Sequence, residues 1–306
     1  MTSDRSSLRA YGALALTMLF WAGNTIAGRA VRDDIGPFTL AFGRWLIALL
    51  ILTPFVVRGA AAQWPQVKRH WPVILFLGLV GVAGFNGFLY AGLRFTTAGN
   101  GLLLQALIPG LVMLTGVLAF RDRVSAGQVL GVALSTLGVT VIVFHGDMRA
   151  VLQLSLGYGD ALILSGCVAW AVYTACLRLR PPMSPLHFMY LTFLIATLAM
   201  APLAVQELRA VPIAWSPKVA GVLAYVGIFP SLIAYFLYNG AVTRLGAASA
   251  GQTISLMPVF GALLAAQILD ERLYRYHAIG MAAILFGIVL TWMMLRKRDD
   301  AAQASG

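Results

Sequence analysis

The side chains best suited to chemistry in this sequence are aromatic, amide and hydroxyl groups spaced three or four positions apart inside long apolar runs. Trp21 and Asn24 stand three positions apart, and Asn86 and Tyr90 stand four apart. On a helix, both spacings place the two side chains on one face. Polar groups within a membrane are costly unless they are satisfied, so they tend to face the interior of a bundle or a cavity. Rings with amide and hydroxyl neighbours suit the binding of a zwitterion that bears an apolar side chain.

We predict that such groups line a single cavity. The predicted substrate-binding residues are Trp21, Asn24, Asn86, Tyr90, Asn100, Gln105, Trp170, Tyr173, Tyr235, Tyr238, Asn239, Gln252 and Ser255. For any one of them, the alternative is a hydrogen bond that only joins two helices. For the whole set we favour a cavity, because a helical bundle can hardly bury this many polar and aromatic groups in pairs.

Three further residues are predicted to be structural or gating. Arg44 is the one basic residue well inside an apolar run, where it could extend towards the interface, bind a carbonyl or meet a substrate carboxylate; we expect a structural role. Pro109 and Pro258 fall near the middle of their runs, and each removes one backbone hydrogen bond. A matched pair of such prolines indicates kinked or broken helices beside a transport site, although a simple packing kink is the alternative.

Catalytic and metal-binding patterns are missing from the sequence. An intramembrane enzyme would need paired aspartates, a Ser–His pair or histidine ligands for zinc. The four histidines lie far apart in connectors or at the ends of runs, at His70, His145, His187 and His277. We therefore expect no enzyme, no cofactor and no metal site, and keep an intramembrane enzyme as the rival from a different class.

The elements that must position these residues are membrane-spanning helices. The chain is 60% hydrophobic and 11% charged, with a mean hydropathy of +0.83, whereas soluble domains carry roughly a quarter of charged residues. The net charge of +11 does not indicate nucleic acid, because the basic residues flank apolar segments. Ten apolar runs of about 20 residues predict an all-α integral membrane protein. We place them near 10–29, 37–57, 72–93, 97–120, 125–144, 158–178, 185–205, 218–242, 247–269 and 275–295.

The distribution of basic residues predicts the orientation. The side that holds both termini carries 13 Lys and Arg, against 8 on the other side. Because cytoplasmic loops are enriched in Lys and Arg, both termini are expected to be cytoplasmic. The compact connectors suit a multi-pass protein of a bacterial inner membrane.

The two halves of the chain align at a shift of 149 residues. The matches include uncommon residues in one register, at Trp21 and Trp170, Pro109 and Pro258, Asp122 and Glu271, and Gly131 and Gly280. We predict a first five-helix repeat over 1–146 and a second over 157–296, joined by the connector near 145–157. Since five is odd, the second copy must enter the membrane from the opposite side, which gives the inverted repeat of secondary transporters. The alternative is a duplicated structural bundle without transport.

Several motifs then resemble one known family. They are Arg44-Trp45-Leu46-Ile47-Ala48, Gly159-Asp160 followed by Ala169-Trp170-Ala171-x-Tyr173-Thr174, Ser255-Leu256-Met257-Pro258-Val259, and Asp270-Glu271-Arg272-Leu273. Together and in order, they resemble the EamA family of the drug/metabolite transporter superfamily over nearly the whole chain. Asp122 stands where the family usually has Glu, and Asp270 where it usually has Gly. The resemblance implies export of metabolites, often amino acids, and is strongest to amino-acid exporters that accept aromatic side chains.

The expected function is thus secondary transport of small metabolites, including aromatic amino acids, by alternating access through a central cavity. Exporters of other metabolites or of drugs are the alternative, but small-cation exporters need a carboxylate in the first helix, and none is present there. Asp160 is the only weak candidate for a proton relay, so we expect facilitative transport. The expected partners are a small-molecule substrate and membrane lipid, with the protein a monomer or homodimer.

Overall fold

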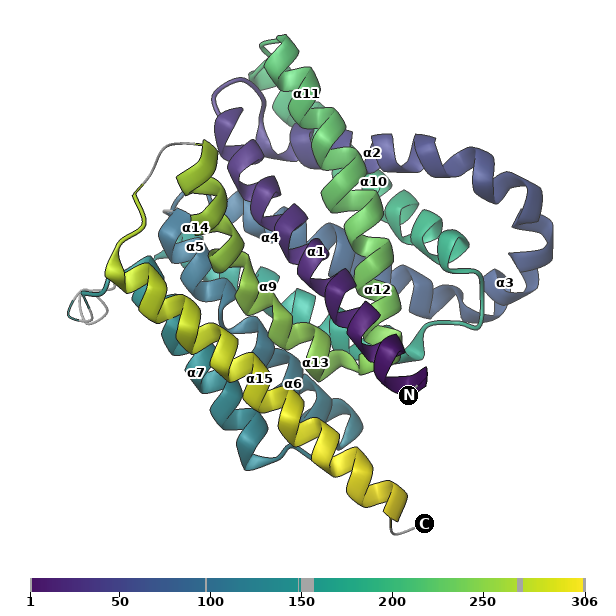
Figure 1. Ribbon diagram of the computed structural model, residues 1–306. Helices are drawn as coiled ribbons and strands as arrows, with labels where there is room; N and C mark the ends of the chain where they lie inside the picture. Colours follow the sequence, from purple (N-terminus) through teal and green to yellow (C-terminus); the bar gives the residue numbers. More distant parts are fainter. Residues whose placement is uncertain (1, 97, 148, 150–156, 269–271, 305–306) are drawn as a thin grey trace.

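The protein is a bundle of helices that lie side by side (Figure 1). The computed structural model describes residues 2–96, 98–147, 149, 157–268 and 272–304, and no strand occurs among them. The α-helices are α1 (Thr2–Ala30), α2 (Pro37–Val56), α3 (Ala60–Leu77), α4 (Phe85–Gly92), α5 (Ala98–Gln105), α6 (Ile108–Phe120), α7 (Ala126–Val143), α9 (Tyr158–Cys176), α10 (Pro185–Ala210), α11 (Pro217–Val226), α12 (Ala234–Leu245), α13 (Ala247–Gln252), α14 (Met257–Ile268) and α15 (Arg275–Ala304).

Nine helical segments among the described residues are long and apolar enough to cross a membrane. One of them, Pro37–Gly92, has 56 residues and would extend about 84 Å if it were continuous, whereas the hydrocarbon core is about 30 Å thick. This segment contains two of the predicted runs, 37–57 and 72–93. The predicted connector between them is itself helical, as the 3₁₀-helix η1 (Val57–Gly59) and the start of α3, with non-helical dihedral angles at His70.

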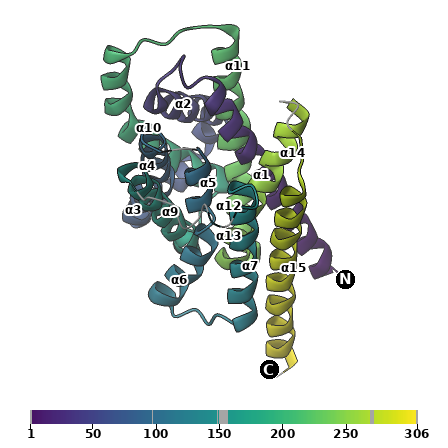
Figure 2. The same cartoon turned by 90° about the vertical axis from the view of Figure 1, so that its left-hand side faces the viewer.

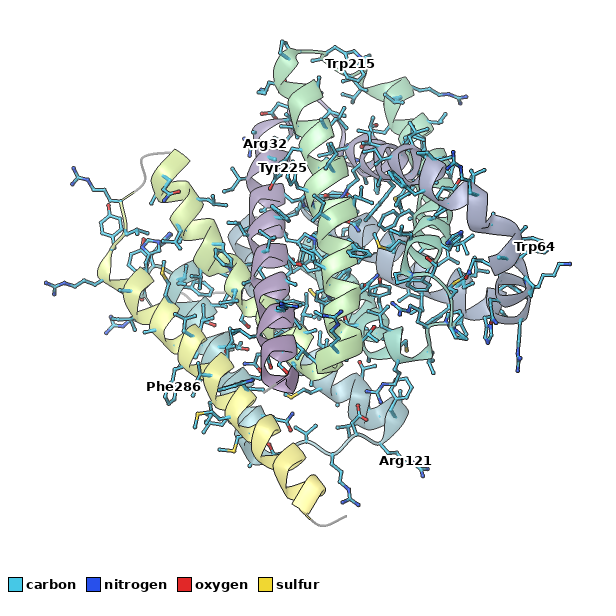
Figure 3. All side chains as sticks on the ribbon, turned by 45° about the vertical axis from the view of Figure 1, so that its right-hand side comes forward. Arg32, Trp64, Arg121, Trp215, Tyr225 and Phe286 are labelled. Carbon is cyan, nitrogen blue, oxygen red and sulfur yellow. The ribbon has the colours of Figure 1, made fainter. Side chains whose placement is uncertain are left out.

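Large apolar side chains cover the outside of the bundle. Leu118 is 75% exposed and Phe286 61%, and Phe286 points away from the bundle in Figure 3. Arg121 lies at one end of the molecule, and Arg32 and Trp215 lie at the other (Figure 3). A belt of exposed apolar residues between two polar ends is the surface that a lipid bilayer requires.

Two of the predicted runs, 97–120 and 247–269, are interrupted helices. α5 ends at Gln105, residues Ala106 and Leu107 form a turn, and α6 begins at Ile108 with Pro109 in its first turn. In the second case, the 3₁₀-helix η5 (Thr253–Leu256) separates α13 from α14, whose second residue is Pro258. Proline is tolerated in the first turn of a helix because its missing N–H has no partner to lose there.

Two π-helices of seven residues lie 149 positions apart, the same shift that aligns the two halves of the sequence. They are η2 (Gly78–Gly84) and η4 (Gly227–Ile233), and each is followed directly by an α-helix, α4 or α12. In η4, Pro230 cannot donate a backbone hydrogen bond, and the Ser231 hydroxyl donates to the Val226 carbonyl 2.6 Å away. Wide turns of this kind are found frequently at functional sites.

Helices α7 and α15 pack against each other through glycines (Figure 2). A Cβ atom on Gly131 would lie 2.6 Å from the Gly287 carbonyl oxygen, and one on Gly138 would lie 2.5 Å from that of Gly280. Between them, the Ser135 hydroxyl donates to the Ile284 carbonyl at 3.3 Å. The absence of side chains lets the two backbones approach closely.

Candidate functional site

A cluster of aromatic rings occupies the centre of the bundle. Trp21 of α1 and Trp170 of α9 meet edge to face, with ring centroids 5.1 Å apart. Tyr235 of α12 lies 6.0 Å from Trp21 and 5.6 Å from Trp170, and Tyr238 lies 5.2 and 5.4 Å from them. The Trp21 indole N–H donates to the carbonyl of Pro230 at 3.0 Å, so the π-helix η4 supplies the acceptor that orients this ring.

Beside the aromatic cluster lies Arg44, which is only 2% exposed. Its Nε donates to the Ser231 hydroxyl at 2.7 Å, and its Nη1 donates to the Tyr90 hydroxyl at 3.0 Å. Two longer contacts, both 3.4 Å, join Nη1 to the amide oxygens of Asn24 and Asn86. The guanidinium also lies over the ring of Trp45, 4.7 Å from its centroid. Arg44 therefore connects α1, α2, α4 and η4 in the middle of the bundle.

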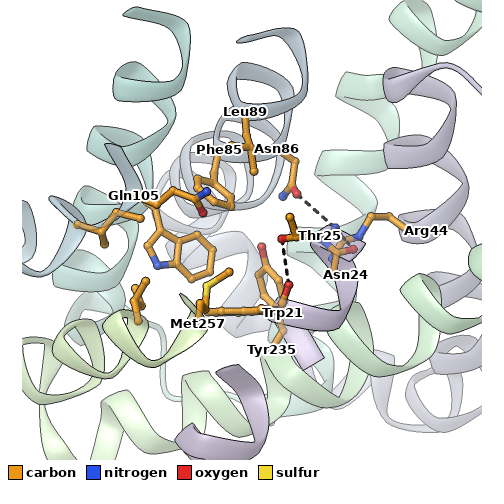
Figure 4. Close-up of a pocket in the computed structure, with 13 residues that line it drawn as sticks. Trp21, Asn24, Thr25, Arg44, Phe85, Asn86, Leu89, Gln105, Tyr235 and Met257 are labelled. Atoms are coloured by element: carbon orange, nitrogen blue, oxygen red, sulfur yellow. Dashed lines mark hydrogen bonds between the residues drawn. The ribbon is translucent and has the colours of Figure 1, made fainter. Parts of the chain in front are cut away.

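The aromatic cluster and Arg44 border one cavity (Figure 4). Its volume is about 40 Å³, room for only a few water molecules. The residues that line it are Trp21, Asn24, Thr25, Arg44, Phe85, Asn86, Leu89, Gln105, Ile108, Trp170, Tyr235, Ile254 and Met257. A molecule of amino-acid size therefore needs the surrounding helices to separate before it can enter.

Two buried polar atoms of lining residues lack a well-formed hydrogen bond to a described group, namely the indole nitrogen of Trp170, which lies near the Tyr238 hydroxyl, and the hydroxyl of Tyr235, which lies near the Asn86 amide. Leaving a buried polar group unsatisfied costs about 1–3 kcal/mol. A bound molecule with polar groups could form hydrogen bonds with both atoms. The cavity therefore offers hydrogen-bonding groups as well as apolar walls.

Seven of the predicted substrate-binding residues either line the cavity or hydrogen-bond to a residue that lines it. Trp21, Asn24, Asn86, Gln105, Trp170 and Tyr235 line the cavity, and Tyr90 reaches it through Arg44. Asn86 is held by its own bond to the Val82 carbonyl, 2.9 Å away within the π-helix η2.

Tyr173, Tyr238 and Asn239 form a layer behind the cavity. The Tyr173 hydroxyl donates to the Asn239 side-chain oxygen at 2.9 Å, and the Tyr238 hydroxyl bonds the Thr174 hydroxyl at 3.0 Å. Both tyrosines are fully buried. These contacts join α9 to α12 and support the Trp170 ring, so the three residues hold the wall of the cavity from outside.

Gln252 and Ser255 are not brought to this cavity. The Gln252 amide donates to the Ser135 hydroxyl at 3.0 Å and accepts from the Thr291 hydroxyl at 2.9 Å, which joins α13 to α7 and α15. Ser255 borders a second, smaller cavity of about 10 Å³, together with Gln105, Pro258 and four apolar neighbours. Pro109 is buried at the start of α6, and the side chain of Asn100 lies outside the described part of the chain.

Sequence reasoning missed the apolar walls and one polar partner. Phe85, Leu89, Ile108, Ile254 and Met257 line the cavity, but in the sequence they look like any other apolar helix residue. Phe85 and Leu89 do stand next to Asn86 or one turn beyond it, which was the available signal. Ser231, the closest partner of Arg44, lies 187 positions further along the chain, and nothing local connects the two.

Among the described residues, no group of three or more His, Cys, Asp and Glu side chains could hold a metal ion. Asp160 is 4% exposed at the beginning of α9 and accepts hydrogen bonds from the Gly157 amide at 2.8 Å and the Thr96 hydroxyl at 2.6 Å. Its carboxylate therefore caps a helix, as aspartate commonly does.

A family model matches this chain twice, over residues 8–144 and 157–293. The chain belongs to the EamA-like transporter family. A protein of Archaeoglobus fulgidus described as an uncharacterized transporter is 31% identical over 281 residues, 91% of this chain and 95% of that protein. A probable terminal-alkyne amino-acid exporter of Streptantibioticus cattleyicolor is 25% identical, over 92% of this chain and 93% of its own.

The fold is also known from experiment. One crystal structure superposes on this chain with a TM-score of 0.72 at 20% sequence identity. The aligned region covers 94% of this chain and 98% of the chain in that structure. The EamA-family protein is thus a multi-pass membrane transporter built from helices, as the sequence motifs predict.

Proposed function

We propose that this EamA-family protein exports small metabolites, most readily amino acids that include aromatic ones, as a secondary transporter with alternating access. The observation that carries the proposal is the central cavity, which is lined both by aromatic rings from α1, α9 and α12 and by amide groups from α1, α4 and α5. Rings suit the side chain of an aromatic amino acid, and amide and guanidinium groups suit its charged end. The amino-acid exporter of S. cattleyicolor among the relatives agrees with this substrate class.

We further propose that the chain forms ten spans in two inverted repeats, over 1–146 and 157–296. Three observations support this arrangement. The two π-helices are 149 positions apart, the family model matches each half, and both termini lie at the lower end of the bundle in Figures 1 and 2, as an even number of spans requires. The connector near 145–157, the proposed junction, lies largely outside the described residues.

The packing of α7 on α15 agrees with a two-fold axis between the repeats. Gly131 and Gly138 correspond to Gly280 and Gly287 at the shift of 149. Gly131 meets Gly287, and Gly138 meets Gly280, so each glycine contacts the counterpart of the other. Ser135 contacts Ile284, its own counterpart. Reciprocal contacts of this kind arise around a two-fold axis.

Transport is proposed to be facilitative, with both termini in the cytoplasm of a bacterial cell and the protein a monomer or homodimer. The helix-capping bonds of Asp160 support the first point, because they give that carboxylate a structural role.

Efflux of labelled amino acids from liposomes that contain the purified protein tests the proposal. Saturable efflux of aromatic amino acids should fall at least about tenfold in Trp170→Ala, because the ring forms a wall of the cavity. Trp64→Ala is the matched control, since Trp64 is 55% exposed at the far edge of the molecule in Figure 3. Equal loss in both variants, or no amino-acid efflux at all, would refute the substrate assignment, and proton-driven flux that Asp160→Asn abolishes would refute facilitative transport.

A further inference from the structure

The charge of Arg44 is not balanced by a carboxylate in the part of the chain that the structure describes. The ion pairs there are Arg32–Asp33, Arg94–Glu207, Arg178–Asp122 and Lys218–Asp34, and Arg44 is in none of them. All four of its hydrogen-bond partners, Asn24, Asn86, Tyr90 and Ser231, are neutral. Arginine does not lose its proton in proteins, so a full positive charge lies buried in the bundle.

A purely structural role leaves this charge unexplained. Neutral oxygen atoms stabilise a buried cation in part, but buried charges are normally paired with an opposite charge. An arginine is also an uncommon means of joining helices that Asn, Gln or Ser could join without charge. The unbalanced charge indicates that the missing partner is a bound anion.

The guanidinium has donors left for such a partner. Nη2 makes no hydrogen bond to a described residue, and the two amide contacts of Nη1, at 3.4 Å, are near the long limit for a hydrogen bond. Arg44, Asn24 and Asn86 all line the cavity, and Figure 4 shows Arg44 and its amide neighbours at one side of it. An anion in the cavity could therefore accept a hydrogen bond from Nη2 and replace the two long contacts that Nη1 makes with Asn24 and Asn86.

The composition of the site indicates which anion it is. One guanidinium offers two parallel N–H groups, which match the two oxygens of a single carboxylate. A phosphate dianion would call for further basic residues, and among the described residues no other Lys or Arg lines the cavity. The rings of Trp21, Trp170 and Tyr235 also line the cavity, so the rest of the ligand is expected to be apolar.

We propose that Arg44 is the residue that binds the anionic group of the substrate, and that the substrates are small carboxylates with an apolar portion. This inference rests on the proposed function as a transporter with a central cavity, and it makes the carboxylate the feature that the protein recognises. Amino acids belong to this class, but the amino group is not required by it.

Binding to the purified protein in detergent, measured by calorimetry, tests the inference with ligand pairs that differ in one group. The pairs are tryptophan with tryptophanamide and 3-phenylpropionate with 3-phenylpropionamide. The parent protein should bind each acid at least about tenfold more tightly than its amide, the effect of one charge-assisted pair of hydrogen bonds. Arg44→Gln should abolish the difference, and Arg44→Lys should keep part of it.

Arg32→Gln removes a cation at the end of the bundle, where its side chain is 68% exposed, and should leave the preference unchanged. If Arg44→Gln does not fold, the acid and amide pairs on the parent protein and on Arg44→Lys still decide. Equal binding of acid and amide by the parent, an unchanged preference in Arg44→Gln, or no binding by any of the four compounds would each overturn the inference.

Efflux from liposomes separates this inference from the proposed function. Arg44-dependent binding of 3-phenylpropionate without amino-acid efflux would refute amino-acid export and leave the role of Arg44 intact. Saturable amino-acid efflux, together with equal binding of acids and their amides, would support amino-acid export and refute the role of Arg44.

Discussion

At the scale of single residues, two glutamines that look alike in the sequence have different surroundings. Gln105 and Gln252 both precede a proline in an interrupted helix. Gln105 borders both cavities, and among the described residues its amide donates to the Gly101 carbonyl of its own helix. Gln252 is 2% exposed and joins three helices through Ser135 and Thr291. The first is placed for contact with a ligand, and the second holds the bundle together.

This difference predicts opposite effects of two matched substitutions. Gln252→Ala leaves the Ser135 and Thr291 hydroxyls with fewer partners and should destabilise the protein by about 1–3 kcal/mol, with the substrate preference unchanged. Gln105→Ala should alter efflux more than stability. Thermal unfolding in detergent and efflux from liposomes measure the two effects. A changed substrate preference in Gln252→Ala with an unaltered melting temperature would contradict the assignment.

The sequence predicted which residue types surround the cavity but not which of them lie in it. Spacing on a helix identified Trp21, Asn24 and Asn86, because a face is a local property of a helix. It could not separate Gln105 from Gln252, or relate Arg44 to Ser231, because those contacts depend on how distant helices pack. The structural role expected of Arg44 stays a prediction, since the sequence alone could not identify the neighbours that the side chain joins.

At the scale of elements, one ion pair joins the two halves of the chain at the end of the bundle that holds both termini. Asp122 follows α6, and Arg178 lies in the 3₁₀-helix η3 (Leu177–Leu179) after α9. Two hydrogen bonds of 2.9 and 2.5 Å connect the guanidinium to the carboxylate, and Arg178 also lies 4.2 Å from the centroid of the Phe120 ring. In the alternating access proposed above, one end of the cavity closes while the other opens, and we propose that this pair helps to hold one end closed.

We therefore predict that exchanging these charges affects transport more than stability. Both side chains are 40% exposed, and exposed ion pairs contribute only about 0–1 kcal/mol to folding. Asp122→Arg and Arg178→Asp should each lower the efflux rate several-fold, and the double exchange should recover most of it. If the double variant is as slow as the product of the single effects predicts, the two residues do not act as a pair.

Element boundaries were predictable where they follow from composition. Apolar runs gave the lengths of α7 and α9 to within two residues, whereas α10 extends to Ala210, five residues beyond its run. The prolines at 109 and 258 marked the two helices that are interrupted. The π-helices were not predicted, because an apolar segment has the same composition whether it winds as an α-helix or a π-helix. The helical turn over 58–71 was also missed, since its charged residues resemble those of a connector.

At the scale of the whole molecule, the proposed inversion makes a prediction about two arginines. Arg123 and Arg272 occupy equivalent places in the two halves, 149 positions apart, and both are exposed. If the second half is inverted relative to the first, equivalent residues lie on opposite sides of the membrane. The excess of basic residues further predicts that Arg123 is cytoplasmic.

Single cysteines test this prediction in a background without Cys167 and Cys176, both of which are buried and free. In intact cells, a membrane-impermeant thiol reagent should label Arg272→Cys and should label Arg123→Cys only after the membrane is opened. Labelling of both variants from the same side would exclude the inversion. Labelling of Arg123→Cys alone in intact cells would keep the inversion and reverse the orientation.

The two π-helices restrict how this chain can change in length. An α-helix advances by about 100° per residue, so the loss of one residue from η2 would rotate everything that follows it by that angle if α-helical winding were restored. Asn86 and Tyr90 would then turn away from the cavity, and a deletion in η4 would do the same to Tyr235. Substitutions inside these turns leave the downstream side chains in phase, whereas deletions do not. At these two places the number of residues, more than their identity, determines which way the downstream binding side chains face.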